Sequence, residues 1–562
     1  MFMLFLIGVC LALEPNPRLK IKVKTSKYVS FHFSTFKEDV VTHHHEGQST
    51  TLLGVTNTLY EFNFKTKNNV TIDFSPEDIQ STFSENSKSN YLTSINKYEN
   101  KTLICGSNNR NPLCWFLVGY QKETSRFGRG LAPYSYDMSN LVLTQDSNIY
   151  STNPNSMRSD SKFRRIEKPP QLYLDDKVVK SPKYVKATYF EETVKTNNTV
   201  YIFFAETGIS KVSRVCVSDR GGEGSLSGSM WSTFLKSRLV CADEELRVFN
   251  YLTDVFVING THIFGLFINE WKFSAVCVYL FKSIQNNFNT SPLKGYIGPP
   301  LKVKPGTCLN TTTPPETFKV IHSHPEILED TVGSFIFGNK FHYTRLTANI
   351  TGNATVFFLS TNEGKIHKVV HYPDGTLNIV EITIKHYHTH VLSLELDVKM
   401  NKLYVAYNDS IIELPSALCS LYGYTCDDCL LARDPQCGWY KEKCSITDEG
   451  LKLLQFNINN VPKDICANST IEHHYLNRTV FLKNSFYHIL SCPTSSFQAE
   501  YRWFDRHNQT LVNCPLGTDL CHFMIPTIKK HYGNYICRSN EGWSNTIQVS
   551  ETIKKKKKKP KN

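Results

Sequence analysis

Short segments rich in β-branched and aromatic residues recur along the chain from about residue 20 to residue 418. Examples lie at 52–55, 199–204, 254–258, 355–359 and 402–406. Clusters of Gly, Asn, Asp and Pro separate these segments, as is typical of turns between antiparallel strands. A helical periodicity competes only near 231–239 and 325–330. The stretch is too long for one sandwich and lacks a repeated Gly-His…Trp-Asp signature. The pattern therefore predicts a β-propeller of several four-stranded blades that is not a WD40 array.

A different pattern extends from about residue 467 to residue 551. It contains a Cys…Trp…Tyr-x-Cys array formed by Cys492, Trp503, Tyr535 and Cys537. This spacing is the signature of an immunoglobulin domain, in which a disulfide joins two sheets and packs on a buried Trp, with a tyrosine corner just before the second Cys. The segment is therefore predicted to be an immunoglobulin-like β-sandwich, with Cys514 and Cys521 closing a local loop.

Between these two regions, five cysteines lie within 26 residues, from Cys419 to Cys444. So short a segment cannot bury a core of its own and needs disulfides or a metal ion. Cys426 and Cys429 form the C-x2-C pair that structural zinc sites use. However, Cys437 and Cys444 are seven residues apart, and no nearby His completes a set of ligands.

The N-terminal residues decide between these alternatives. Residues 1–13 form an apolar stretch with the small residue Ala12 near its end and Glu14-Pro15 after it. This composition is typical of a secretory signal peptide, although it lacks the usual preceding basic residues; the alternative is a buried N-terminal strand. Removal of the peptide takes Cys10 and leaves sixteen of the 17 cysteines. An even number in an exported chain favours eight disulfides over a zinc site.

Asn-x-Ser/Thr sequons also fit an exported glycoprotein. The predicted glycosylation sites are Asn69, Asn100, Asn197, Asn259, Asn310, Asn349, Asn353, Asn408, Asn468, Asn477 and Asn508. A further sequon at Asn289 is set aside because Pro292 follows it.

The charge distribution limits the partners that we expect. The net charge is +12, and the terminal KKKKKKPKN stretch holds seven of the positive charges. Because the rest of the chain is only mildly basic, nucleic acid is not expected as a partner. The tail at 552–562 is interpreted as solvated, with weak heparan sulfate binding through Lys554–Lys559 as the alternative. No apolar run predicts a transmembrane span and no hydrophobic C-terminal tail signals a lipid anchor, so we expect a soluble product.

Patterns for catalysis and metal binding are weak. No Gly-x-Ser-x-Gly elbow, His-Glu-x-x-His helix or repeated Ser-x-Asp-x-Gly-x-Thr-Trp box occurs, so we expect neither enzymatic activity nor a cofactor. His43–His45 and the alternating His386, His388 and His390 are geometric candidates for a metal ion. Without a carboxylate partner, solvated or edge-strand histidines are the preferred interpretation.

The domain order and several motifs resemble the semaphorin family. The segment CLLARDPQCGW at 429–439 is similar to their plexin-semaphorin-integrin (PSI) domain. Further family landmarks are ICGSNNRNPLC (104–114), GG…WSTFLKSRLVC (221–241), DVF (254–256), SAVC (274–277) and KPGTC (304–308). A narrower resemblance to class 7 semaphorins and to soluble semaphorins of large DNA viruses rests on GLAPY (130–134), FRRI (163–166), LKGY (293–296) and IHKVV (366–370).

This resemblance implies an all-β protein with a seven-bladed sema propeller at 14–418. A PSI module at 419–466, an immunoglobulin-like domain at 467–551 and the tail at 552–562 follow. It also implies a pairing for all sixteen cysteines. The implied disulfides are Cys105–Cys114, Cys216–Cys308, Cys241–Cys277, Cys419–Cys437, Cys426–Cys466, Cys429–Cys444, Cys492–Cys537 and Cys514–Cys521.

The function implied by the resemblance is that of a secreted, non-enzymatic ligand for a cell-surface plexin, of class C, acting on host adhesion, migration or immune responses. Family precedent also implies a homodimer. For the receptor contact we select the polar loop with Ser218, Asp219, Arg220 and Glu223, because loops on a rigid scaffold carry function. The alternative is a decoy or heparan-sulfate-retained binding protein that does not signal.

Two features depart from the class 7 pattern. The segment after Cys216 is VSDRGG (217–222), and no Arg-Gly-Asp occurs, so integrin binding is in doubt. Class 7 semaphorins are also lipid-anchored, whereas this sequence ends in the lysine run.

Overall fold

The protein is described by a computed structural model in which β-strands predominate. The described residues are 17–33, 40–76, 89–123, 125–135, 138, 140–145, 147–157, 161–167, 169–175, 177–192, 197–245, 247–258, 260–385, 389–447, 453–455, 466, 475–482, 487–515, 518–528 and 531–556. The predicted signal peptide at 1–13 lies outside them.

Seven sheets of four or five strands occupy the described residues from Leu19 to Pro415. The first contains β3 (Val41–His44), β4 (Thr50–Gly54), β5 (Thr58–Asn63) and β6 (Asn68–Asp73). The second contains β7 (Leu92–Tyr98), β8 (Lys101–Gly106), β9 (Leu113–Val118), β10 (Gln121–Lys122) and β11 (Arg126–Phe127), and the third β12 (Val142–Gln145), β13 (Asn148–Ser151), β14 (Arg164–Arg165) and β15 (Leu172–Tyr173).

The fourth sheet contains β16 (Lys183–Phe190), β17 (Thr199–Glu206), β18 (Ile209–Cys216), β19 (Leu235–Val240) and β23 (Thr331–Val332). The fifth contains β20 (Tyr251–Ile258), β21 (His262–Ile268), β22 (Ser274–Leu280) and β24 (Ser334–Asn339). The sixth contains β25 (Tyr343–Thr351), β26 (Ala354–Thr361), β27 (Ile366–His371), β28 (Leu377–Thr383) and β1 (Leu19–Lys22), and the seventh β29 (Ser393–Asp397), β30 (Lys402–Ala406), β31 (Ser410–Pro415) and β2 (Ser30–His32).

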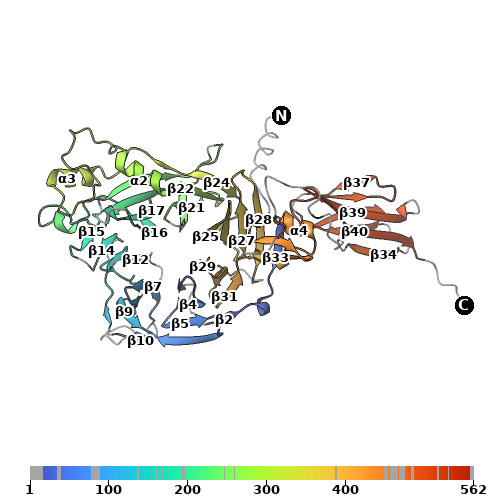
Figure 1. Ribbon diagram of the computed structural model, residues 1–562, viewed down its shortest axis with the longest axis horizontal. Helices are drawn as coiled ribbons and strands as arrows, with labels where there is room; N and C mark the ends of the chain where they lie inside the picture. Colours follow the sequence, from blue (N-terminus) through green and yellow to red (C-terminus); the bar gives the residue numbers. More distant parts are fainter. Residues whose placement is uncertain are drawn as a thin grey trace.

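The sheets are arranged in a closed ring (Figure 1). Seven strands, β3, β7, β12, β16, β20, β25 and β29, contact one another in this order, and β29 contacts β3. The seventh sheet joins the two ends of the ring, because the early strand β2 pairs with β31. Strand β1 pairs in parallel with β28 of the sixth sheet. Backbone hydrogen bonds therefore hold the ring closed.

The strand predictions agree with the structure, but the helix predictions were wrong. The five segments predicted as strands lie largely within β4, β17, β20, β26 and β30. The segment predicted as a helix at 231–239 ends in strand β19, which pairs with β18 and β23. The other, at 325–330, is irregular and hydrogen-bonds to Lys236 of β19 through the Pro325 carbonyl and the Ile327 amide. Cross-strand pairing therefore outweighed the local helical pattern.

Two helices instead lie in the long insertion between β22 and β24. Helix α2 spans Phe281–Thr290 and buries Ile284 and Phe288. Helix α3 spans Pro315–Ser323 and starts with a proline, which favours the first helical turn because its φ is preset and its missing N–H is not needed there. Short 3-10 turns occur at η2 (Thr25–Lys27) and η5 (Ser227–Ser229).

The cysteine module, here residues 419–446, follows the ring. It contains η6 (Cys419–Leu421), α4 (Cys426–Leu431), β32 (Cys437–Tyr440) and β33 (Lys443–Ile446). Helix α4 begins with a capping box in which Thr425 accepts a hydrogen bond from the Asp428 amide and Asp428 accepts one from the Thr425 amide.

The C-terminal region forms two sheets from the described residues 475–556. One contains β34 (Leu476–Leu482), β40 (Ser544–Lys555), β39 (Gly533–Glu541), β36 (Glu500–Phe504) and β37 (Thr510–Asn513), and the other β35 (Tyr487–Pro493) and β38 (Leu520–Pro526). The Cys492–Cys537 disulfide joins β35 to β39. Trp503 is fully buried beside it. The Tyr535 hydroxyl donates to the His531 carbonyl at 2.8 Å. Strand β40 continues to Lys555, beyond residue 551, where the sequence predicted the end of the C-terminal domain.

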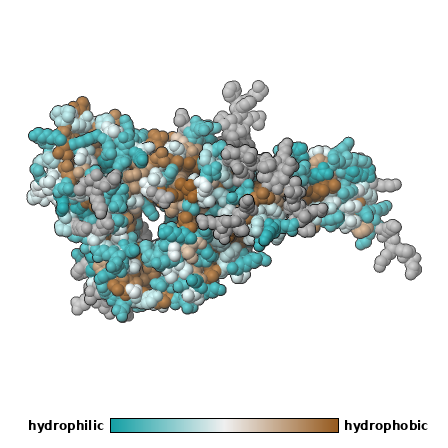
Figure 2. All heavy atoms as spheres, in the orientation of Figure 1, coloured by the Kyte–Doolittle hydropathy of each residue, from teal (hydrophilic) through white to brown (hydrophobic). Residues whose placement is uncertain are grey.

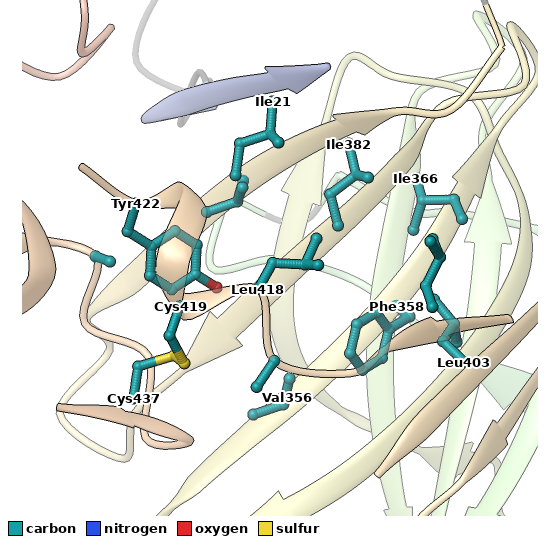
Figure 3. Packing of buried hydrophobic residues seen from close by; sticks show 14 of the residues in the cluster. Ile21, Val356, Phe358, Ile366, Ile382, Leu403, Leu418, Cys419, Tyr422 and Cys437 are labelled. Atoms are coloured by element: carbon teal, nitrogen blue, oxygen red, sulfur yellow. A yellow bond between two sulfur atoms is a disulfide. The ribbon is translucent and has the colours of Figure 1, made fainter. Parts of the chain in front are cut away.

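One hydrophobic core connects the ring to the cysteine module (Figure 3). Figure 3 shows Ile21, Ile366, Ile382, Leu418 and the Cys419–Cys437 disulfide gathered in this core. The module therefore continues the core of the ring and is not an independent unit. Figure 2 shows hydrophilic residues over much of the visible face, with hydrophobic patches on the ring and on the C-terminal region.

Candidate functional site

The loop selected from the sequence connects β18 to β19. We call residues 217–234 the Asp219 loop. Cys216, at the end of β18, forms a disulfide with Cys308 of the insertion. The backbone of the loop also bridges to the insertion, because the Glu223 amide donates to the Thr313 carbonyl and the Thr313 amide to the Gly221 carbonyl. The loop and the insertion thus form one surface.

Asp219 organises this loop from within and does not face a partner. Its side chain is only 1% exposed. Its carboxylate accepts hydrogen bonds from the Gly221 amide at 2.7 Å and from both the amide and the hydroxyl groups of Ser232 and Thr233 at 2.6–3.0 Å. The prediction that Asp219 contacts the receptor directly was therefore wrong. A short polar loop must satisfy its own buried amides, and this carboxylate does so.

Arg165 of β14 supports the loop from the neighbouring sheet. Its guanidinium is buried and donates to the carbonyls of Val217 and Asp219, both at 2.7 Å. The same group lies 5.4 Å from the ring of the buried Trp231, in a cation–π contact. Trp231 thus belongs to the core.

Close backbone contacts make the loop rigid. Gly221 has a φ of +77°, and a Cβ there would lie 2.4 Å from the Gly228 carbonyl oxygen. A Cβ on Gly222 would lie 2.7 Å from the ring of Phe318 in α3. These two positions therefore require glycine, Gly221 for its backbone conformation and both for space.

The exposed tip of the loop is small. Arg220 and Glu223 are exposed, and Ser218 is half-buried. Leu226 is 80% exposed, and sequence analysis did not select it. The available signal was an apolar residue isolated in a Gly- and Ser-rich run. Arg220, Glu223, Ser225 and Leu226 are the exposed side chains of this loop.

A buried network of lysines and glutamates holds the insertion against the fourth sheet. Glu206 accepts from Lys236 at 2.7 Å and from Lys211 at 3.0 Å, and Lys211 also donates to Glu326 of the insertion at 2.6 Å. Burial opposes ionisation of both glutamates, but hydrogen bonds from the lysines lower the pKa of Glu206 and of Glu326 below the ordinary value. Both glutamates are therefore ionised at neutral pH.

The family motif in the cysteine module also has a structural role. Lys368 of β27 and Asp434 of the module are each about 1% exposed in their side chains and form an ion pair. The Lys368 ammonium also donates to the Ser416 carbonyl at 2.9 Å and to Gln436 at 2.8 Å. The motif therefore anchors the module to the sixth sheet and has no exposed side of its own here.

The structure contains eight disulfides, and they are the same eight pairs that the family resemblance implies. They are Cys105–Cys114, Cys216–Cys308, Cys241–Cys277, Cys419–Cys437, Cys426–Cys466, Cys429–Cys444, Cys492–Cys537 and Cys514–Cys521.

Of the histidine candidates, His43 and His44 lie on β3. In the part of the chain that the structure describes, no group of three or more His, Cys, Asp or Glu side chains is arranged to hold a metal ion. His44 instead bonds to Asp397 at 2.8 Å, and burial lowers the pKa of His43 to about 4. His386 and His388 lie outside the described residues.

Most sequons occupy accessible positions. Exposed sequon residues are Asn69, Asn100, Asn197, Asn289, Asn310, Asn353, Asn477 and Asn508, and half-buried ones are Asn349 and Asn408. Asn259 and Asn468 lie outside the described residues.

Comparisons with known proteins agree with this architecture. Residues 252–398 match the family model of the Sema domain, and residues 418–458 match that of the plexin repeat. Mouse Semaphorin-7A is 34% identical over 94% of this chain and 85% of its own length, and human Semaphorin-7A is 33% identical over 91% and 83%.

Solved structures show the same fold. Drosophila Semaphorin 2a aligns with a TM-score of 0.76 at 20% identity, covering 97% of this chain and all of its own. A structure of Drosophila Plexin A in complex with Semaphorin 1b aligns with a TM-score of 0.65 at 21% identity, over 80% of this chain and 98% of that one.

The fold and these matches define a protein built on a Sema domain with a plexin-repeat (PSI) module. The chain belongs to the semaphorin family. Among the described residues, no helix is long and apolar enough to cross a membrane.

Proposed function

We propose that this protein is an extracellular semaphorin ligand that binds a plexin. The observation that carries the proposal is the similarity to Semaphorin-7A, which extends over nearly the whole chain. The proposal is also supported by a solved structure of Drosophila Plexin A in complex with Semaphorin 1b, which contains a chain with the same fold as this protein. The eight disulfides favour an oxidising, exported location. No catalytic function is proposed.

The architecture supports presentation of a receptor-binding surface. We interpret the seven sheets of the ring as the blades of a seven-bladed propeller and the two C-terminal sheets as an immunoglobulin-like domain. The closed cycle of strand contacts supports the first interpretation, and the Cys492–Cys537 disulfide beside Trp503 supports the second. The contact surface proposed on this scaffold is the exposed tip of the Asp219 loop.

The receptor class and assembly follow from the family resemblance. We propose a class C plexin and a homodimeric ligand. Two copies of one surface in a dimer engage two receptors, and binding at the second site then benefits from a high effective concentration. The effect on host cells is modulation of adhesion, migration or immune response. Integrin binding is not proposed, because the sequence has no Arg-Gly-Asp.

Binding of the purified protein to cells with and without the plexin tests the proposal. We expect saturable binding that requires the receptor and that weakens when Arg220, Glu223 and Leu226 are changed to Ala, Ala and Ser. The matched control is Lys101→Ala, a charge on another sheet whose side chain is 42% exposed. Binding that is unchanged by loss of the receptor would overturn the function, and equal effects of the tip and control variants would overturn the contact surface.

A second candidate function is a non-signalling decoy retained on heparan sulfate. It is favoured by the exposed lysines at positions 554, 555 and 556, the last described residues. Heparin competition and replacement of these lysines by alanine test it. If the decoy function is right, either treatment abolishes binding of the protein to cells, and this binding is the same with and without the plexin. Distribution of the protein between medium and cells tests secretion, which retention in the cell fraction would contradict.

A further inference from the structure

A polar cavity of about 250 Å³ lies between the fourth sheet and helix α2 of the insertion. Its lining comes from the segment before β17, from β17 and β18, from α2 and from residues 304–308. Sites for drug-sized ligands measure about 300–1,000 Å³. This cavity therefore suits a smaller group, such as one sugar ring.

The floor of the cavity is fixed and cationic. Arg214 of β18 is only 5% exposed. Its guanidinium donates to the Asn289 side-chain oxygen at 2.7 Å and to the Gly306 carbonyl at 3.1 Å. It also lies 5.2 Å from the ring centroid of Phe288. Because the bonds to Asn289 and Gly306 restrain the guanidinium, the floor is formed before any group enters.

The rim carries polar side chains from three segments. Gln285 of α2 donates a hydrogen bond to Glu192, which precedes β17. Lys304 and Thr307 are exposed on the opposite segment. Amide, carboxylate, ammonium and hydroxyl groups together match the hydroxyl and acetamido groups of an amino sugar.

Two sequon residues line this cavity, and the structure distinguishes them. The side-chain oxygen of Asn289 is bound to Arg214 at the floor, and Pro292 follows its sequon. Asn197 is exposed, and its carbonyl oxygen lies 4.0 Å from the sulfur of Cys308. The next residue, Asn198, accepts hydrogen bonds from the Val217 amide at 2.9 Å and from the Glu192 amide at 2.8 Å, so the backbone holds Asn197 beside the cavity.

We propose that the proximal N-acetylglucosamine of a glycan on Asn197 packs over this cavity. The sugar then contacts α2 and residues 304–308 together and holds the insertion against the fourth sheet. Attachment forms a bond between Nδ2 of Asn197 and the anomeric carbon of an oligosaccharide. One Nδ2 proton is lost, and the bond from the anomeric carbon to the lipid-diphosphate carrier breaks. The inference rests on the proposed export of the chain, because this transfer occurs in the secretory pathway.

Glycopeptide mass spectrometry and hydrogen–deuterium exchange on the protein from mammalian cells test this inference. We expect an occupied Asn197 and an unoccupied Asn289. Trimming the native protein to its proximal sugar with endoglycosidase H, after expression with high-mannose glycans, leaves exchange in 281–308 unchanged. Asn197→Gln raises exchange there several-fold. The matched control Asn353→Gln, in an exposed turn with open space beside Gly352, leaves it unchanged.

The outcomes separate this inference from the proposed function. A protein with no occupied sequon contradicts export and the inference together. Occupancy of other sequons but not of Asn197 overturns the inference alone. One further result would overturn the inference. In the unmutated protein with an occupied Asn197, complete deglycosylation by peptide N-glycosidase F would leave exchange in 281–308 at the untreated level.

Discussion

The Asp219 loop and the cysteine module are both short segments, but they are fixed in different ways. The loop is organised by one buried carboxylate with five hydrogen bonds and by the support of Arg165. The module is fixed by three disulfides and by the buried Lys368–Asp434 pair. The loop keeps an exposed tip, whereas the identifying motif of the module faces the ring.

A motif that identifies a family and a surface that contacts a partner can therefore lie in different parts of the molecule. A motif that identifies a family can serve to join domains, as Asp434 does when it docks the module on β27. A surface loop of which half the residues are Gly and Ser can present the contact surface, because its buried side chains hold the exposed ones in place. Four predictions test this contrast, from the largest expected effect to the smallest.

The largest effect is expected at the module. Lys368→Ala leaves the Asp434 carboxylate buried without its cation, which costs about 3–5 kcal/mol of unfolding free energy. Urea unfolding followed by tryptophan fluorescence measures this loss. Lys101→Ala is the control, because its ion pair with Glu123 is exposed and is worth about 0–1 kcal/mol. Equal losses in both variants would remove the distinction between docking and surface pairs.

A smaller loss is expected inside the loop. Asp219→Asn places an amide NH2 against the N–H and O–H donors of Ser232 and Thr233, and unsatisfied buried donors cost about 1–3 kcal/mol. The same unfolding measurement applies. Asp374→Asn, in an exposed turn where Asp374 accepts from Thr376, is the matched control and should have a smaller effect. A stable Asp219→Asn variant with unchanged plexin binding would show that the carboxylate does not organise the loop.

Acid should weaken the attachment of the insertion. The folded-state pKa values of Glu206 and Glu326 are lowered, so the stability they contribute is present above the ordinary glutamate pKa and is lost as pH falls through the lowered values. At neutral pH, Glu326→Gln should lower the unfolding free energy by about 1–2 kcal/mol relative to the parent protein. This difference should shrink below about pH 4, where the parent protein loses the same charge. Unfolding curves of both proteins against pH measure it; a constant difference would contradict the ionised network.

The smallest effect on stability is expected at the tip of the loop. Arg220→Ala and Glu223→Ala remove exposed side chains and should change the unfolding free energy by no more than about 0.5 kcal/mol. Thermal and urea unfolding check this value. If the proposed contact is right, these variants weaken plexin binding while the fold stays stable, whereas Asp219→Asn lowers stability as well as binding.

Much of the architecture could be predicted from local patterns. Segments rich in β-branched and aromatic residues, separated by turn residues, predicted the strands. The spacing of cysteine, tryptophan and tyrosine predicted a separate C-terminal region. The eight disulfides match the implied pairs because the family motifs position each cysteine. The helices at 281–290 and 315–323 were missed because both are short and lie in a turn-rich insertion, where periodicity extends over too few residues.

The candidate site shows where such prediction ends. Ser218, Asp219, Arg220 and Glu223 are neighbours in sequence, and composition alone gives them the same polar character. Only the fold brings Ser232, Thr233 and Arg165 around Asp219 and so buries it while Arg220 stays exposed. Likewise, Lys368 and Asp434 are far apart in sequence, and their pairing requires β27 and the module to meet.

The sequence by itself therefore determined the strand-rich class, the order of the Sema and PSI regions and the semaphorin resemblance, because these depend on patterns between residues near one another in the chain. The tertiary structure decided which polar residues are buried, which are exposed and which sequon lies beside a cavity. These properties depend on contacts between distant segments, and burial changes the role of a side chain without changing the local pattern around it.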